Sequence, residues 1–294
     1  MKRKKWVIIF SAILFLAIAV GSLIYLLCFS NRASNVYTDK GKEFCKSEEY
    51  NEGIKCFNQA VKINSKNASA YYNKGQALYC LEKYDEAVEC FDKAISIDKK
   101  GAVEFTDVLM YSYNEKAIDL FKFEKYKEAI KWLDKAIKFA SENDYEPYYN
   151  KGLAYFNIGL NKEAIIWFDE AIAKNPKDPY TYSLKADALR EEQRYDEALE
   201  CCDKALELKP EDIGLYINKG WMLYYMSRHE EAQNCFDEGL KIDPNSFEVY
   251  YNKGLTLTMI HKLDEARAAF EKALKIKPNS SQAKEQLEML NKYK

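Results

Sequence analysis

Apolar side chains recur along the chain at helical spacing, and the whole pattern repeats after about 34 residues. Within one repeat, positions i, i+4 and i+7 form two apolar stripes, at Tyr71, Gly75 and Leu78 and again at Ala87, Phe91 and Ala94. A short polar segment, Glu82–Glu86, separates the two stripes. In later repeats a proline follows the second stripe and ends the helix, at Pro176, Pro210, Pro244 and Pro278. The pattern predicts a repeat made of helix, turn, helix and stop.

The repeats stay in phase over most of the chain. Aligned on the glycine of the recurring sequence Asn-Lys-Gly, they number seven: 34–67, 68–101, 110–143, 145–178, 179–212, 213–246 and 247–280. Two insertions interrupt the phase, one of eight residues at Ala102–Leu109 and one of a single residue at Asp144. Eight residues correspond to about two helical turns, so we expect the first helix of the third repeat to be extended at its N-terminus. The sequence shows no linker and no second type of domain.

Small residues recur where the two helices of a repeat would face each other. They are Gly75, Gly152, Gly220 and Gly254 on the first helix and Ala87, Ala164, Ala232 and Ala266 on the second. With no large side chain between them, the two axes can approach closely in antiparallel packing. A single helix pair cannot bury both of its faces, so the repeats must stack. The stripe that then becomes a continuous core is Phe57, Phe91, Leu133, Phe168, Cys202, Phe236 and Phe270.

The order of these residues resembles that of the tetratricopeptide repeat family. The fourth repeat carries the match at Tyr148, Gly152, Tyr155, Ala164, Phe168, Ala171 and Pro176. The resemblance covers 34–280, with departures at Gly53, Gly239 and Cys202 and no final proline in the first three repeats. It implies an all-α, right-handed superhelical solenoid of antiparallel helix pairs, whose concave face binds peptides or protein partners. After the last repeat, residues 281–294 predict a capping helix with Ser280 or Ser281 as its N-cap.

The N-terminus has a different composition from the repeats. Residues 1–5 are basic, and Trp6–Ser30 then runs for 25 residues without a charge, which as a helix would span about 37 Å. We expect a retained transmembrane anchor rather than a cleaved signal. Lipid attachment at Cys28 fits poorly, because Leu27 stands where a small residue is required. The positive-inside rule predicts a single-pass membrane protein with a cytoplasmic N-terminus and extracytoplasmic repeats. The excess of lysine over arginine, with many Tyr, Ile and Asn residues, favours a bacterial cell membrane.

Side chains suited to catalysis or metal binding are few. The formal net charge of −2 gives no sign of nucleic-acid binding. The two histidines, His229 and His261, fall in the expected turns between helices. Four of the eight cysteines share one position in their repeats, as small buried side chains would, and no CxxC pair is present; the four are Cys56, Cys90, Cys201 and Cys235. We therefore expect no enzyme activity, no cofactor, no metal and no small-molecule substrate.

By the resemblance, the first helix of each repeat lines the concave face. A second stripe, turned by about 100° from the packing stripe, carries apolar and aromatic residues in the later repeats. With the asparagines that commonly bond a ligand backbone in the family, it gives the candidate groove residues Tyr149, Asn150, Leu153, Phe156, Ile217, Asn218, Trp221, Tyr224, Tyr225, Tyr251, Asn252 and Leu255. The stripe is polar at Thr38 and Lys42, and Ser183, Asp187 and Arg190 interrupt it. The alternative is that these aromatics only fill the inside of a tight superhelix.

These observations predict a membrane-anchored scaffold or adaptor that binds a peptide or protein segment in the groove. The alternative is a structural component of a cell-envelope or secretion machine that uses its convex surfaces. A protein or peptide is the expected partner in both, and nucleic acid is not.

One lysine position recurs in all seven repeats, at Lys40, Lys74, Lys116, Lys151, Lys185, Lys219 and Lys253. It belongs to the pentapeptide Tyr-Tyr-Asn-Lys-Gly, whose first tyrosine is expected to pack between the helices and whose second is expected to face the groove. A lysine stem can cover apolar surface while its ammonium reaches water, so we expect a packing role. A glutamate row lies near the start of the second helix, where the macrodipole favours a carboxylate, at Glu52, Glu86, Glu128, Glu163, Glu197, Glu231 and Glu265. Whether the two rows meet stays open.

Overall fold

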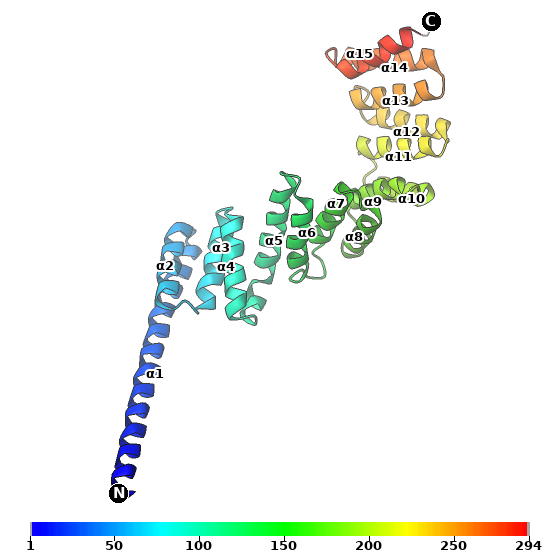
Figure 1. Cartoon of the computed structure of the whole chain (residues 1–294). Helices are drawn as coiled ribbons and strands as arrows, with labels where there is room; N and C mark the ends of the chain where they lie inside the picture. The colour runs from blue at the N-terminus through cyan, green and yellow to red at the C-terminus, as the bar shows by residue number, and fades with distance from the viewer. Residues whose placement is uncertain (1, 293–294) are drawn as a thin grey trace. The chain divides into compact units, whose positions relative to one another are not determined.

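The computed structural model describes residues 2–292, with side chains described for residues 19–101 and 103–292. All regular structure in this part of the chain is helical. The chain forms two compact units, Met1–Ser141 and Glu142–Lys294, which are called unit 1 and unit 2 below. Figure 1 shows each unit as a row of helix pairs. The predicted all-α repeat solenoid is therefore confirmed.

Unit 1 holds three helix pairs and a short connecting helix. The bounds are α1 (Lys2–Lys46), α2 (Tyr50–Ile63), α3 (Ala68–Cys80), α4 (Tyr84–Ile97), η1 (Gly101–Phe105), α5 (Thr106–Phe121) and α6 (Tyr126–Ile137). α5 is 16 residues long and follows directly on the 3-10 helix η1. The insertion at Ala102–Leu109 therefore extends the first helix of the third repeat, as predicted, but part of it forms a separate 3-10 turn.

Unit 2 holds four helix pairs and a final single helix. The bounds are α7 (Glu146–Asn157), α8 (Asn161–Lys174), α9 (Pro179–Glu191), α10 (Tyr195–Leu208), α11 (Ile213–Tyr225), α12 (His229–Ile242), α13 (Phe247–Met259), α14 (Leu263–Ile276) and α15 (Ser281–Asn291). Each second helix contacts the first helix of the next pair, and α14 contacts α15 in the same way. Ser280 caps α15, because its side chain accepts a hydrogen bond from the Ala283 N–H at 3.3 Å.

The predicted membrane anchor falls within the long first helix. α1 continues from Lys2 into the first repeat, where the Ser34 hydroxyl donates to the Ala60 carbonyl at 2.8 Å. The side chains of residues 6–18, the first half of the predicted anchor Trp6–Ser30, lie outside the described side chains. Among the residues that the structure describes, no helix has the length and apolar character needed to cross a membrane. This finding contradicts the predicted single-pass membrane localisation, with its cytoplasmic N-terminus and extracytoplasmic repeats.

In five of the seven helix pairs a phenylalanine ring of the second helix packs against a glycine of the first. A Cβ added at Gly220 would lie 2.7 Å from the Phe236 ring, and one added at Gly152 would lie 2.7 Å from the Phe168 ring. Both phenylalanines are fully buried. The close approach of the two helices therefore requires the absence of a side chain at these glycines, as the small residues in the sequence predicted.

The turn inside each pair places one residue in the left-handed region. The positive φ values are 61° at Glu48, 58° at Glu82, 55° at Glu124, 76° at Gly159, 60° at Gln193, 59° at Ser227 and 62° at His261. The next N–H then bonds back to the first helix, as Lys83 does to the Leu78 carbonyl at 3.0 Å. His261 lies in the turn as predicted, whereas His229 is the first residue of α12. Six of these seven positions carry a side chain where glycine would be unstrained.

Candidate functional site

The twelve predicted groove residues all lie on first helices of unit 2. α7 carries Tyr149, Asn150, Leu153 and Phe156, α11 carries Ile217, Asn218, Trp221, Tyr224 and Tyr225, and α13 carries Tyr251, Asn252 and Leu255. α9 stands between α7 and α11 and contacts both, and α11 contacts α13. The four first helices of unit 2 therefore lie side by side and could present one surface.

Side-chain caps fix where three of these helices, α9, α11 and α13, begin. The Asp178 carboxylate accepts from the Thr181 N–H at 2.8 Å at the start of α9, and the Asp212 carboxylate accepts from the Gly214 N–H at 3.0 Å at the start of α11. The Ser246 hydroxyl accepts from the Val249 N–H at 3.3 Å at the start of α13. Caps of this kind satisfy N–H groups that have no partner within the helix. They set the register of the surface residues one to four turns later.

Several predicted groove residues also take part in packing. The Tyr149 ring lies 6.4 Å from the Phe168 ring, and the Tyr251 ring lies 5.8 Å from the Phe270 ring. Burial raises the pKa of the Tyr149 phenol. The second tyrosine of the pentapeptide is thus half-buried against the second helix, and that its remaining surface faces the groove stays a prediction. Phe156, Ile217 and Leu255 are half-buried in the same way, each against the core of its unit.

The asparagines of the pentapeptide do not share one environment. Asn218 on α11 donates to the Ser183 hydroxyl on α9 at 2.9 Å, so its amide joins two repeats. Asn150 is only 8% exposed, whereas Asn252 is half-exposed. The prediction that these amides bond a ligand backbone stays a prediction, and Asn218 would have to share its amide with Ser183.

The most exposed aromatic group of the surface lies at the end of α11. The Trp221 ring lies 5.6 Å from Tyr224 and 6.3 Å from Tyr225, and the Tyr224 and Tyr225 rings are 5.7 Å apart. Tyr195 at the start of α10 stacks on Tyr225 at 6.1 Å with an interplanar angle of 13°. Tyr225 is nevertheless 48% exposed. We call Tyr195, Trp221, Tyr224 and Tyr225 the aromatic cluster.

Charged groups and a hollow border the aromatic cluster. The guanidinium of Arg190 lies 5.7 Å from the Tyr225 ring centre, and its Nη2 is 3.7 Å from Asp187 and 2.8 Å from Glu191. Burial raises the pKa of the Asp187 carboxyl, although Arg190 opposes the shift. A pocket of about 360 Å³ lies alongside, lined by Gln193, Arg194, Tyr195, Asp196, Glu197 and Met226. An aromatic, partly charged surface beside a hollow is suited to holding a side chain of a protein segment.

The sequence reasoning missed Tyr195 and treated Arg190 as an interruption. Tyr195 belongs to the second helix of the preceding repeat, outside the stripe that defined the groove. A signal was present, because an aromatic residue begins the second helix in other repeats too, at Tyr50, Tyr84 and Tyr126. In those repeats Tyr84 and Tyr126 contact the end of their own first helix instead.

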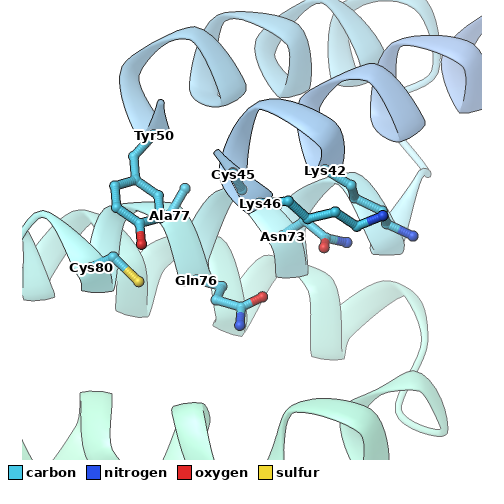
Figure 2. A pocket seen from close by; sticks show the side chains of 8 residues that line it. All are labelled: Lys42, Cys45, Lys46, Tyr50, Asn73, Gln76, Ala77 and Cys80. Atoms are coloured by element: carbon cyan, nitrogen blue, oxygen red, sulfur yellow. The ribbon is translucent and has the colours of Figure 1, made fainter. Parts of the chain in front are cut away.

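A second hollow lies in unit 1, between α1, the start of α2, and α3. Figure 2 shows its lining residues, which are Lys42, Cys45, Lys46, Tyr50, Asn73, Gln76, Ala77 and Cys80. Its volume is about 340 Å³. Of these residues only Lys42 was predicted to lie on the groove stripe, as a polar position, and the pocket as a whole was not predicted. We call it the α1–α3 pocket.

Within the part of the chain that the structure describes, no group of three or more histidine, cysteine, aspartate or glutamate side chains could hold a metal ion. The eight cysteines are free thiols, and Cys90, Cys201, Cys202 and Cys235 are buried. The predictions of no cofactor and no catalysis stay predictions.

Family profiles described as tetratricopeptide repeats match most of the chain. They match residues 68–100 and 247–280, 41–81, 179–245 and 114–179. A comparison with curated proteins gave no significant match.

Solved structures of repeat proteins have a similar fold. The C-terminal part of a TPR repeat-containing protein from Cytophaga hutchinsonii is 19% identical, with 85% of this chain and 99% of that chain covered and a TM-score of 0.63. A thermophilic TPR protein of Thermus thermophilus is 18% identical, with 62% and 98% covered and a TM-score of 0.50. A chain of the APC/C hetero-tetramer Cut9-Hcn1 is 16% identical, with 90% and 55% covered and a TM-score of 0.50. At these identities the likeness concerns the fold.

Proposed function

Because this chain belongs to the tetratricopeptide repeat family, we propose that it is a protein-interaction scaffold that holds a segment of a partner protein on the first helices of unit 2. The groove residues predicted from the sequence are proposed as its contact surface. The chain then works as a binding module rather than as an enzyme.

The aromatic cluster is the observation that carries the proposal. Three of its four rings lie at the end of one helix and pack on one another, which holds them in place without a partner. Tyr225 keeps nearly half of its surface exposed. Fixed aromatic side chains beside an arginine are the groups that contribute most to protein interfaces, where their truncation costs about 2 kcal/mol or more. Tyr225 would be the central contact of the interface, and Arg190 would border it.

The test compares two tyrosines of nearly equal exposure. Tyr225 is 48% exposed inside the cluster, and Tyr180 is 47% exposed at the start of α9, outside it. Partners captured from the source cell by cross-linking to the wild-type chain are identified, and the affinity of each purified partner is then measured for wild type, Tyr225→Ala and Tyr180→Ala. We expect Tyr225→Ala to weaken binding by about 2 kcal/mol, roughly 30-fold, and Tyr180→Ala to leave it unchanged.

Equal affinities for all three proteins would refute the groove assignment. Equal affinities are what the alternative predicts, in which the chain is a structural component of a larger assembly and contacts it through its convex surfaces. Circular dichroism and the urea midpoint of each variant confirm that a lost affinity does not come from a lost fold.

A further inference from the structure

The α1–α3 pocket combines two cations with an exposed thiol. Lys42 and Lys46 stand one helical turn apart on α1, and Cys80 ends α3 on the other side of the pocket. Figure 2 shows the side chains of Lys42 and Lys46 over the α3 residue Asn73 and the sulfur of Cys80 beside the hydroxyl of Tyr50. The pocket lies wholly within unit 1, so its chemistry is independent of the function proposed for unit 2.

The lining of the pocket carries two lysine side chains. Its lining contains no carboxylate. Among the described residues, Lys42 has no ion-pair partner, and Lys46 pairs with Glu43 at 2.7 Å, where both side chains are 71% exposed. An ion pair so exposed is weakened by water and salt and leaves much of the lysine's attraction in place. The amide of Gln76 adds hydrogen-bond donors, whereas the Asn73 amide already donates to the Ser69 carbonyl at 2.6 Å. An anionic group with oxygen acceptors is the ligand that this lining favours.

Cys80 is the thiol of the pocket that can react. It is exposed, whereas Cys45 on the facing helix is half-buried. Burial raises the pKa of the Cys45 thiol, and the neighbouring Cys80 and Cys56 raise it further, so its reactive thiolate is scarce. The hydroxyl of Tyr50 hydrogen-bonds Cys80, which raises the pKa of the Tyr50 phenol because the phenol is held as a donor.

We propose that the α1–α3 pocket binds small anionic disulfides and that Cys80 exchanges with them to form a mixed disulfide. The Cys80 thiol gives its proton to the solvent, and the thiolate attacks one sulfur of the bound disulfide. A new S–S bond forms between Cys80 and that sulfur while the original S–S bond breaks. The other half leaves as a thiolate and takes up a proton. The Cys80 sulfur is oxidised and the departing half is reduced, so no further oxidant is needed. Carboxylates of the ligand face Lys42 and Lys46.

The size of the pocket fits this class of ligand. A volume of about 340 Å³ is at the lower end of the range of small-molecule sites. Large disulfide-bearing proteins would be excluded from it, and one half of a small disulfide, carrying one or two carboxylates, would fill it.

The test uses two disulfides of opposite charge on the full-length chain. A Cys28→Ser background leaves Cys80 as the one cysteine classed as exposed among the described residues. The rate of adduct formation is measured with glutathione disulfide, which is anionic, and with cystamine, which is cationic, and the modified cysteine is located by peptide mass mapping. We expect the adduct at Cys80 and, in Lys42→Gln and Lys46→Ala, a roughly threefold to tenfold lower rate with glutathione disulfide. The cystamine rate should stay equal or rise.

Lys55→Ala is the matched control, because Lys55 on α2 pairs with Glu52 at 2.6 Å, has a side chain 71% exposed like that of Lys46, and lies outside the pocket. It should leave both rates unchanged. The proposal would be overturned if Lys42→Gln and Lys46→Ala left the ratio of the glutathione disulfide rate to the cystamine rate unchanged. An adduct on a cysteine other than Cys80, or a Cys45–Cys80 disulfide with no retained adduct, would do the same. Each variant is compared through the ratio of its adduct-formation rates with the two disulfides. A general loss of stability would change both rates and would not produce the expected change in their ratio.

Discussion

Lys219 on α11 and Asp203 on α10 form an ion pair of 2.6 Å that joins two consecutive repeats. The same pair recurs one repeat earlier, between Lys185 and Asp169 at 2.5 Å, and one repeat later, between Lys253 and Asp237. The recurring lysine of the pentapeptide therefore meets an aspartate row. Several glutamates of the glutamate row instead pair with a residue three positions away at the start of the same helix, as Glu231 does with the N-cap residue Arg228 at 2.6 Å. In these three repeats the lysine therefore pairs with an aspartate and not with the glutamate row.

Two substitutions of Lys219 separate the contribution of its charge to stability from the contribution of its aliphatic stem. Lys219→Met keeps an apolar stem and removes the ammonium. The Asp203 carboxylate is 49% exposed, and pairs of this kind contribute about 0–1 kcal/mol, so we expect a loss of less than about 1 kcal/mol in the free energy of unfolding. Lys219→Ala also removes the stem that covers the helix, and we expect a larger loss, about 1–2 kcal/mol. Urea unfolding followed by circular dichroism measures both.

Lys241→Met is the control for that comparison, since Lys241 pairs with Glu238 within one helix and its side chain is 69% exposed. It should not change stability measurably. If Lys219→Met proved as costly as Lys219→Ala, the ion pair and not the stem would be what the repeat needs at this position.

Two glycines of the sixth repeat should respond in opposite directions to alanine. A Cβ at Gly220 would lie 2.7 Å from the fully buried Phe236 ring, and overpacking of this kind costs about 1–3 kcal/mol. A Cβ at Gly239 would meet Val249 at 3.4 Å, an ordinary contact. Gly239→Ala should therefore stabilise unit 2 by about 0.5–1 kcal/mol, because alanine is the better helix former. The urea midpoint of each variant gives the sign, and equal signs would contradict this account of the helix contact.

Two equivalent turns inside helix pairs carry different residues at the position with positive φ, so glycine and glutamine can be substituted for each other there. Gln193 has a φ of 60° and Gly159 a φ of 76°, at the same place in their repeats, and nothing lies within 4 Å of a Cβ built at Gly159. A glutamine and a glycine at this turn position therefore differ in backbone strain and not in side-chain contacts. We expect Gly159→Gln to destabilise unit 2 by about 1 kcal/mol and Gln193→Gly to be neutral or stabilising by a few tenths. Thermal unfolding of both variants checks the exchange, and a stabilised Gly159→Gln would show that the strain is absent.

Much of the fold was predictable because it is local or periodic. The contact between Gly220 and Phe236 follows from a small residue and a ring at fixed positions of one repeat. The Asn218–Ser183 hydrogen bond and the stacking of Tyr195 on Tyr225 cross between repeats. They depend on the rotation of one helix pair against the next, which spacing along the sequence does not give. The α1–α3 pocket was missed for the same reason, since Cys45 and Cys80 occupy different places in their repeats.

Asp187 lies on the groove stripe of α9, and its replacement tests the electrostatics beside the aromatic cluster. Burial raises the pKa of its carboxyl above the ordinary value of about 3.9. The native state therefore binds the proton more tightly than the unfolded state, so the ionised carboxylate costs stability above the raised pKa, and this cost disappears as the pH falls below the ordinary value. Asp187→Asn should raise the urea midpoint of unit 2 at pH 7, and this gain should vanish near pH 3.

Asp196→Asn provides the comparison, because Asp196 is exposed at the start of α10 and its replacement removes one charge from the same unit. We expect no gain from it at either pH, since an exposed carboxylate is hydrated in both states. A lower midpoint for Asp187→Asn at pH 7 would mean that attraction to Arg190, 3.7 Å away, outweighs the cost of burial. Arg190 would then be held beside Tyr225 by Asp187, and the carboxylate would belong to the support of the aromatic cluster. If the urea midpoint of Asp187→Asn instead rises at pH 7 and not at pH 3, Asp187 is a half-buried charge that lowers the stability of unit 2. Residues of binding sites often lower stability in this way.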